Sequence, residues 1–178
     1  MHSKSELISL GGQISRDGEG ALSRESKSNP LISIITVNLN DGKFLEETIL
    51  SVTSQTYKNI EYIIIDGGSK DQSLDIIKKY RNKISFWESK RDDGIYDAMN
   101  KAIKLATGEW INFMNSGDSF YDNNVLENIF TKEDLTGVDI TYGNIQVVYP
   151  GTNKIRMAKP GKLENLSRGS QFCHQSSF

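Results

Sequence analysis

The sequence predicts an α/β fold: a mostly parallel sheet with helices on both faces, followed by a small antiparallel strand region. From residue 30 onward, short β-branched apolar runs alternate with amphipathic segments, and the runs are apolar nearly throughout. Such runs are typical of strands buried on both faces, which occur in parallel sheets covered by helices. Three of these runs end directly in polar loops, and in such sheets those loops lie together at the carboxyl edge.

Strands and helices are expected in regular alternation. Buried strands are predicted at 31–37, 60–65, 84–87 and 110–114. Helices are predicted with apolar positions at 44–52, 74–80 and 95–106, and a short one at 125–130. Further strands are predicted at 140–142, 145–149 and 155–157. The clearest helical spacing is that of residues 95, 99, 102, 103 and 106, with Gly108 expected as the glycine that ends this helix.

Composition places the chain among ordinary globular proteins. Its 178 residues fit one domain, predicted at 30–178, and the polar segment 1–29 is predicted to be a flexible leader. A net charge of −2 without a basic stripe argues against nucleic-acid binding. The single cysteine excludes an internal disulfide, and no apolar run approaches the roughly 18 residues that span a bilayer. A soluble cytoplasmic protein is therefore expected.

Several common active-site motifs are missing from the sequence. There is no G-x-G-x-x-G after the first strand, no G-x-x-x-x-G-K-[ST] and no G-x-S-x-G. The two histidines, His2 and His174, lack the neighbours of a catalytic triad. These absences argue against a dinucleotide-dependent oxidoreductase, a P-loop hydrolase and an α/β-hydrolase.

Carboxylates and amides remain at the ends of three predicted strands. They occupy the loops 38–41, 66–71 and 115–118. Asp66 and Asp118 could each simply cap their own loops, and Asp92 and Asp93 favour capping of the helix that follows them. Since the loops should meet at one edge, however, the groups together suit a divalent cation with its phosphates, or the hydroxyls of a sugar.

These segments, in this order, resemble the family-2 glycosyltransferases, in the branch found in bacterial polysaccharide gene clusters. The resemblance covers about residues 31–178. It is carried by the motifs ISIITVN at 32–38, LSVTSQTY at 50–57, EYIIIDGGSKD at 61–71, DGIYDAMNKA at 93–102 and ATGEWINFMNSGD at 106–118.

The resemblance implies a GT-A fold, a nucleotide-diphosphate-sugar donor with UDP-sugars favoured, and Mg²⁺ or Mn²⁺. It also implies a set of donor-binding residues. These are Thr36, Val37, Asn38, Asp66, Ser69, Asp71, Asp93, Asn100, Asn115 and Ser116. Of them, Val37 and Asp66 are expected near the base and Asp93 near the sugar.

The sequence departs from the family pattern at the metal motif. Asn115 and Gly117 stand where the family usually has the first and third carboxylates, which leaves Asp118 as the expected metal ligand, with His174 as a further candidate. The family's general base usually lies downstream of a segment like 172–178, so no residue of this chain is assigned as the base and the acceptor half is expected to be incomplete.

The implied reaction is inverting, metal-assisted transfer of a sugar to a hydroxyl of a growing, lipid-linked glycan. The implied setting is the cytoplasmic face of a membrane, with peripheral association and no nucleic-acid partner. Two alternatives stay open. One is a catalytically incomplete module that only binds nucleotide, and the weaker one is a sugar nucleotidyltransferase, which would need a Gly-rich loop with Arg and Lys after the first strand.

Overall fold

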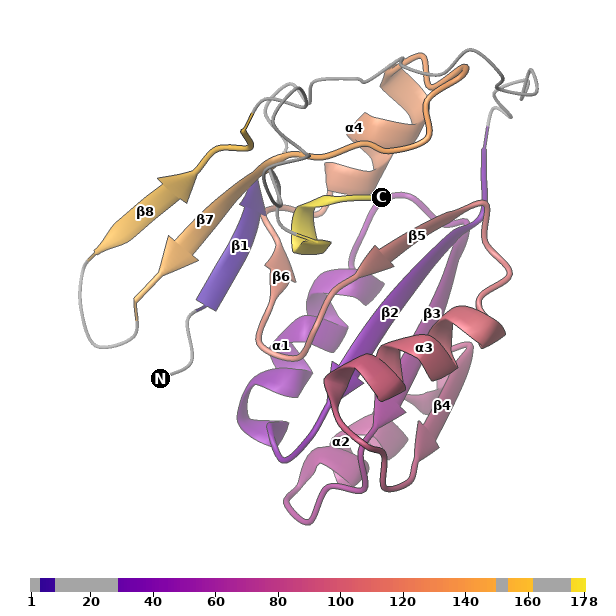
Figure 1. Ribbon diagram of the computed structural model, residues 1–178, viewed down its shortest axis with the longest axis vertical. Helices are drawn as coiled ribbons and strands as arrows, with labels where there is room; N and C mark the ends of the chain where they lie inside the picture. The colour runs from indigo at the N-terminus through magenta and orange to yellow at the C-terminus, as the bar shows by residue number, and fades with distance from the viewer. Residues whose placement is uncertain (1–3, 9–28, 150–153, 162–173) are drawn as a thin grey trace.

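Two four-stranded sheets form the frame of the protein (Figure 1). The computed structural model describes residues 4–8, 29–149, 154–161 and 174–178. The larger sheet has the order β4-β3-β2-β5, and all of its strand pairs are parallel, as predicted. Its strands are β2 (Ile32–Asn38), β3 (Ile60–Asp66), β4 (Phe86–Ser89) and β5 (Trp110–Phe113).

Helices cover both faces of this sheet (Figure 1). On one face lie α1 (Gly42–Thr53) and α2 (Ser73–Lys79), followed by the short 3₁₀ helix η1 (Arg81–Lys83). On the other face lies α3 (Ile95–Leu105). No helix in the described part of the chain is both long and apolar enough to span a bilayer.

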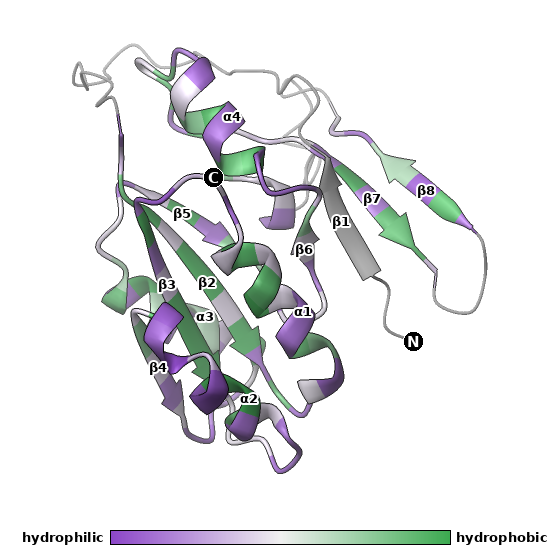
Figure 2. Cartoon of the chain, turned by 180° about the vertical axis from the view of Figure 1, so that it is seen from behind, coloured by the Kyte–Doolittle hydropathy of each residue, from purple (hydrophilic) through white to green (hydrophobic). Residues whose placement is uncertain are grey.

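The side chains of β2 and β3 alternate between two separate hydrophobic clusters. Ile34 and Ile64 pack with α1 and α2, whereas Ile35 and Ile63 pack with α3. These four side chains are 0–1% exposed, and burial of such a side chain stabilises the fold by about 1.5–3 kcal/mol. Both neighbouring strands are therefore hydrophobic along most of their length (Figure 2), which explains their unbroken apolar runs.

The smaller sheet has the order β6-β1-β7-β8. Its strands are β6 (Ser119–Phe120), β1 (Lys4–Ile8), β7 (Asn144–Val148) and β8 (Ile155–Ala158). β7 and β8 pair antiparallel and confirm the predicted C-terminal antiparallel region. Helix α4 (Val125–Lys132) precedes them and buries Leu126 and Phe130 against the α1 side of the large sheet.

Three expectations about local structure are wrong. Residues 4–8 form β1, although the whole segment 1–29 was expected to lack structure; positions 1–3 and 9–28 lie outside the described residues. Residues 140–142 form no strand, since only Tyr142 makes a bridge, to Ser177. The third strand begins two residues later than predicted, at Phe86. In each case pairing with a distant segment decides the outcome, and local pattern does not report it.

Two details of α3 also differ from the expectation. Ile95 and Ile103 are 49% and 43% exposed, because Ala98, Met99 and Ala102 are the residues that face the sheet. The helix ends at Leu105, and Gly108 lies beyond its cap. A Cβ on Gly108 would lie 2.5 Å from Ser33 Oγ, so close contact with β2 requires this glycine, and helix termination does not.

Candidate functional site

The loops that follow the large sheet's strands converge at its carboxyl edge, as the sequence predicted. Main-chain hydrogen bonds continue past the strand ends: Gly67 N donates to Asn38 O over 2.9 Å, and Ser116 N donates to Val37 O over 3.2 Å. Lys90 N likewise donates to Asp66 O over 2.9 Å. Four consecutive strands therefore present one continuous edge, the place where ligands bind in open α/β sheets.

Asp66 is the centre of a hydrogen-bond network at this edge. Its side chain is 0% exposed, and each carboxylate oxygen accepts several hydrogen bonds. Asn38 Nδ2 (2.7 Å) and Ser69 Oγ (2.5 Å) donate to Oδ1, and Ser89 Oγ (2.6 Å) and Ser69 N (2.9 Å) donate to Oδ2. Gly68 N adds a longer bond of 3.2 Å to Oδ2. Because both oxygens are engaged, a ligand would reach this carboxylate only by displacing one of these donors.

The same network keeps Asp66 ionised. Burial acts to raise its pKa, but hydrogen bonds from Ser69, Ser89 and Asn38 outweigh burial and lower the pKa below its ordinary value. Donors that stabilise a carboxylate have this effect because they favour its charged form. The negative charge at the edge is thus held by neutral donors and not by an ion pair.

The first two loops of the edge are locked to each other. Asn40 N donates to Ser69 Oγ over 2.7 Å, and Lys70 N donates to Asn40 Oδ1 over 2.7 Å. Asn40 adopts a left-handed backbone with φ 52°, a conformation that Asn tolerates better than most residues. The rigid contact pair makes the edge preorganised for a ligand.

Asp71 joins two helix starts instead of lining an open pocket. Its carboxylate accepts from Gly42 N at the start of α1 (2.8 Å) and from Ser73 N at the start of α2 (3.0 Å). Asp41 occupies the N-cap position of α1 but makes no side-chain cap, and Asp71 accepts from the first turn of that helix in its place. Burial acts to raise the pKa of Asp71, and the bonds from Ser73 and Gly42 lower it overall.

Asn38 carries the feature that most directly indicates a ligand. The residue is 5% exposed, and its Oδ1 is buried without a hydrogen-bond partner among the described residues. A buried acceptor that lacks a donor costs about 1–3 kcal/mol. Native structures rarely keep such a group without a reason, and here it lies at the edge where three loops meet.

Thr36 and Val37 do not present their side chains at the edge. Thr36 is 0% exposed; its hydroxyl donates to Met114 O over 2.7 Å and hydrogen-bonds with the Tyr62 hydroxyl over 3.0 Å. Val37 packs in the α3 cluster. Both residues therefore act through the shape of β2, and contact between a ligand and these side chains would need rearrangement of the core.

Asp93 and Asn100 lie on the exposed side of the α3 region. Asp93 N donates to Asp97 Oδ2 over 3.1 Å, and Gly94 N donates to Asp92 Oδ1 over 3.0 Å. Gly94 is the N-cap residue, and no side chain caps the helix there. The carboxylates of this turn thus organise its backbone, without the helix cap that the sequence suggested.

The loop after β5 contacts His174, which lies 59 residues further along the chain than Asn115. Asn115 Nδ2 lies 3.1 Å from His174 Nε2, and Asn115 Oδ1 is buried without a partner among the described residues. Ser116 Oγ donates to Asp41 Oδ2 over 3.1 Å. His174 is exposed as a whole, but desolvation of its ring lowers its pKa, which favours the neutral imidazole.

The described residues at this edge do not supply a complete set of ligands for a divalent cation. Within the described residues no three His, Cys, Asp or Glu side chains are grouped to hold a metal. Asp118 is 7% exposed, and Thr48 Oγ1 donates to its main-chain oxygen over 2.8 Å. The His174 ring lies beside Asn115, and a cation at this place would take most of its ligands from phosphates and water, which is the usual mode for Mg²⁺.

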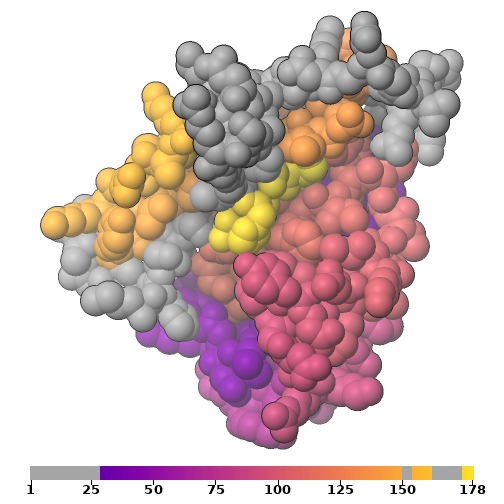
Figure 3. Space-filling view, viewed as in Figure 1, coloured from indigo at the N-terminus to yellow at the C-terminus, as the bar shows by residue number. Residues whose placement is uncertain are grey.

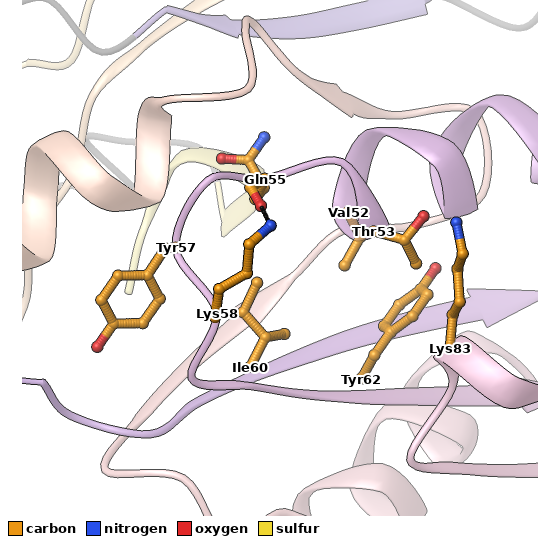
Figure 4. A pocket seen from close by; sticks show the side chains of 8 residues that line it. All are labelled: Val52, Thr53, Gln55, Tyr57, Lys58, Ile60, Tyr62 and Lys83. Carbon is orange, nitrogen blue, oxygen red and sulfur yellow. Dashed lines mark hydrogen bonds between the residues drawn. The ribbon is translucent and has the colours of Figure 1, made fainter.

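A separate cavity of about 250 Å³ lies near the amino end of β3 and is not part of this site (Figure 4). Ile60, Tyr62 and Lys83 are among its lining residues. The strands of the sheet begin there, whereas the polar network lies where they end. The cavity therefore does not bear on the chemistry of the carboxyl edge.

Three residues of the site were missed from the sequence. Ser89 donates to Asp66, Asp41 accepts from Ser116, and Asn112 holds the segment that carries His174. Ser89 is the last residue of β4, whose predicted end lay two residues earlier. A correct strand boundary would have identified Ser89 as a residue of the carboxyl edge. The signal for Asn112 was present, as a polar residue inside an apolar strand.

Comparison with curated proteins gives consistent relatives. The chain is 35% identical over 156 residues to an uncharacterized glycosyltransferase of Mycobacterium tuberculosis. It is 33% identical over 154 residues to a PGL/p-HBAD biosynthesis glycosyltransferase of Mycobacterium bovis. The alignments cover 85% and 84% of this chain and 59% of each relative, so the chain spans less than two thirds of the relatives' length.

Solved structures share the arrangement of strands and helices. S. aureus TarS 1–349 in complex with UDP-GlcNAc matches 56% of this chain and 30% of that one, with a TM-score of 0.51 and 29% identity. The mannosyltransferase PcManGT of Pyrobaculum calidifontis, in complex with GDP-Man and Mn²⁺, matches 71% of this chain and 36% of that one, with a TM-score of 0.56. At 17% identity the second likeness concerns the fold alone. Both support the GT-A fold.

The family match covers most of the chain. Residues 33–176 match the family described as Glycosyl transferase family 2. This range contains all four strands of the parallel sheet except the first residue of β2, and every loop of the candidate site. The chain therefore belongs to glycosyl transferase family 2.

Proposed function

We propose that this chain is the donor-binding part of a glycosyltransferase that moves a sugar from a nucleotide-diphosphate donor to a hydroxyl group. The observation that carries the proposal is the buried Asn38 Oδ1, which has no partner among the described residues and lies beside the ionised Asp66 at the carboxyl edge of a family-2 sheet. An N–H of a nucleobase would supply the donor that this oxygen lacks. Ser69 lies beside Asn38 and Asp66, and Asp71 fixes the end of the same loop to the start of α1.

A UDP-sugar is the donor that we favour. S. aureus TarS, which is 29% identical in the matched part, is described in complex with UDP-GlcNAc. Uracil carries one ring N–H between two carbonyl groups, which suits an isolated acceptor such as Asn38 Oδ1. Asp93 and Asn100 are exposed near the start and middle of α3, and we assign them to the sugar side of the donor.

The diphosphate would lie toward the fourth loop, near Asn115 and Ser116. A divalent cation, held by Asn115, Asp118 and His174 together with the phosphates, would supply positive charge to the departing nucleoside diphosphate. Desolvation lowers the pKa of His174 and so favours the neutral imidazole, the form that can offer a ring nitrogen to a cation. Asp66 and Asn38 orient the base, and the locked loops around Asn40 hold that orientation.

The reaction that we propose inverts the anomeric carbon, and the acceptor is a hydroxyl of a growing, lipid-linked glycan at the cytoplasmic face of a membrane. Both statements rest on the family resemblance. No residue among 1–178 is assigned as the general base. An anomerically retained product would contradict the inverting mechanism.

Calorimetric titration of the 178-residue chain with UDP, GDP and dTDP, with and without Mn²⁺, tests the proposal. We expect UDP to bind, and Asn38→Ala to weaken binding about three- to tenfold, the effect of one net hydrogen bond. Asp118→Asn should remove the gain from Mn²⁺, while the exposed Asp139→Asn should change nothing. A folded parent that binds none of the three nucleotides, or an Asn38→Ala variant that binds as tightly as the parent, would reject the donor site.

A catalytically incomplete nucleotide-binding module is the second candidate. Asn115 and Gly117 stand in place of two carboxylates of the family motif, which favours this alternative. Both candidates would bind the nucleotide, but only the glycosyltransferase would turn over the nucleotide-sugar donor. Release of UDP from UDP-GlcNAc, measured without and with an acceptor lipid, would separate them: release that the acceptor accelerates supports the enzyme, and binding of UDP without any release supports the binding module.

A further inference from the structure

Asn112 is a fully buried polar residue in an otherwise apolar strand. It lies in β5 between Ile111 and Phe113 and is 0% exposed. An amide in such a position is destabilising unless its hydrogen-bonding groups are used. Its location at the edge strand of the large sheet raises the question of what it contacts.

The Asn112 side chain holds the chain segment 174–178. Nδ2 donates to Gln175 O over 3.1 Å and to Ser177 O over 3.0 Å, so both amide hydrogens are used on one short segment. Its Oδ1 is buried without a partner among the described residues. The side chain thus acts as a donor only, and it clasps the two main-chain carbonyls on either side of Ser176.

The other side of this segment is held by main-chain bonds. Thr141 N donates to Phe178 O over 3.0 Å, and Phe178 N donates to Thr141 O over 2.9 Å. Gly143 N donates to Ser176 O over 2.9 Å. Segment 174–178 is therefore fixed between residues 141–143 and β5, and Figure 3 shows it in yellow between the β7–β8 hairpin and the large-sheet unit.

The strand that holds segment 174–178 also leads, three residues after Asn112, to a residue that contacts His174. Asn115, in the loop after β5, has its Nδ2 3.1 Å from His174 Nε2. The segment that Asn112 clasps begins at η3 (His174–Ser176), so one strand both anchors the segment and presents the loop that His174 meets. The segment that carries His174 is thus held by a residue of the same strand that leads into the loop of Asn115.

We propose that Asn112 is a positioning residue that places His174 against Asn115 at the donor site. This inference deepens the proposed function and rests on it for the role of His174, but the placement itself can be measured without any ligand. Only Asn or Gln offers two amide N–H groups to two carbonyl oxygens, and Asp would set a charge against them. Leucine is close to Asn in shape and has no donor.

Asn112→Leu is the test variant, and Gln55→Leu is its matched control. Gln55 is 1% exposed, and its amide also donates to two main-chain carbonyls, those of Ser51 (3.2 Å) and Asp122 (2.8 Å). It lines the cavity near the amino end of β3 (Figure 4) and lies outside the carboxyl edge. Both variants lose a buried amide that donates to two main-chain carbonyls, and Gln55→Leu also loses the bond that Gln55 Oε1 accepts from Leu126 N over 3.2 Å. Only the first should disturb segment 174–178.

Two readouts report the placement of His174. The chain has two histidines, so the NMR signals of the His174 ring are readily assigned in a His2→Ala background. In Asn112→Leu we expect the His174 ring signals to move to the position of a solvent-exposed histidine. We also expect amide exchange at Thr141 and Phe178 to accelerate about tenfold relative to Ile34 in the sheet centre. In Gln55→Leu the His174 ring signals should stay in place, and amide exchange at Thr141 and Phe178 should keep its parent rate relative to Ile34.

A third readout concerns the donor site. In the parent with UDP, added Mn²⁺ should broaden the His174 ring signals, and in Asn112→Leu this broadening should be lost. Should UDP and Mn²⁺ leave the parent unchanged, the proposed function fails, while the ring position and the exchange rates still decide the placement.

Unchanged His174 signals and exchange rates in a folded Asn112→Leu variant would overturn the proposal. Asn112→Thr, which suits a strand and keeps one donor, serves if the leucine variant does not fold, and it should show a smaller shift in the same direction. If neither variant folds, Asn112 is a residue of the sheet core and the positioning role is rejected.

Discussion

Asn38 Nδ2 donates to Asp66 Oδ1 over 2.7 Å and joins the last residues of two neighbouring parallel strands. The bond uses the donor end of the Asn38 amide and turns its acceptor, Oδ1, away from Asp66. One side chain thereby stabilises a buried carboxylate and keeps a buried oxygen at the same edge that has no partner among the described residues. A substitution of Asn38 should therefore affect both the stability of the Asp66 network and the proposed binding of a ligand.

Removal of the Asp66 carboxylate should destabilise the fold as well as the site. In Asp66→Ala the donors from Asn38, Ser69 and Ser89 lose their acceptor, and we expect the free energy of unfolding to fall by about 3 kcal/mol. Urea denaturation measures this loss. The exposed Asp139→Ala should stay within about 0.5 kcal/mol of the parent, and an equally mild effect of Asp66→Ala would show that the network contributes little.

The stability of the protein should depend on the charge of Asp66 at acid pH. Its pKa is lowered in the folded state from the ordinary value of 3.8, so its contribution is present above that value and is lost as the pH falls through the folded-state pKa. Asp66→Asn should be less stable than the parent at pH 7, and the gap should narrow below about pH 4. Denaturation of both proteins between pH 7 and pH 2 checks this; a constant gap would contradict it.

Asn40 should tolerate glycine better than alanine. Its φ of 52° is left-handed, a region that costs residues with a Cβ roughly 1–2 kcal/mol, and Asn is favoured there. Both variants lose the bond from Lys70 N to Oδ1, so their difference isolates the backbone effect. Thermal unfolding should place Asn40→Ala about 1 kcal/mol below Asn40→Gly, and the reverse order would argue against a left-handed residue.

Gly108→Ala should be strongly destabilising for a steric reason. The added Cβ would lie 2.6 Å from Ser33 N and 2.8 Å from Leu31 O, and main-chain atoms cannot move aside easily. We expect a loss of about 3 kcal/mol, measured by chemical denaturation. Gly137→Ala is the comparison: no atom lies within 4 Å of its Cβ, so only its φ of 68° matters, at about 1 kcal/mol. Equal losses would indicate that Gly108 has room for a methyl group.

The amino-acid pattern was sufficient for the parallel sheet and for the place of the site. β2 and β3 are buried on both faces, so their runs of isoleucine leave little alternative to a covered parallel sheet. Asn38 and Asp66 end these strands, and parallel strands end at one edge. Asn115 belongs to the same edge through the pairing of β5 with β2.

The role of each individual residue at that edge was harder to predict from the sequence. Thr36 looked like a ligand contact, yet its hydroxyl is used by Tyr62 and Met114 inside the core. Asp71 looked like part of a pocket, yet it caps two helices. A sequence shows which group can form a hydrogen bond, but it does not show which of several nearby partners is taken.

By itself, the sequence determined the order of strands and helices, the polar edge and the family, because each depends on local pattern and on motifs read along the chain. Tertiary structure alone decided that Asn38 Oδ1 is buried without a partner in the described part of the chain and that residues 4–8 pair as a strand. It also decided that Asn112 brings His174 to Asn115. The physical reason is that these contacts join residues about 30 to 140 positions apart, so their energies depend on distance in space and leave no periodic trace in the sequence.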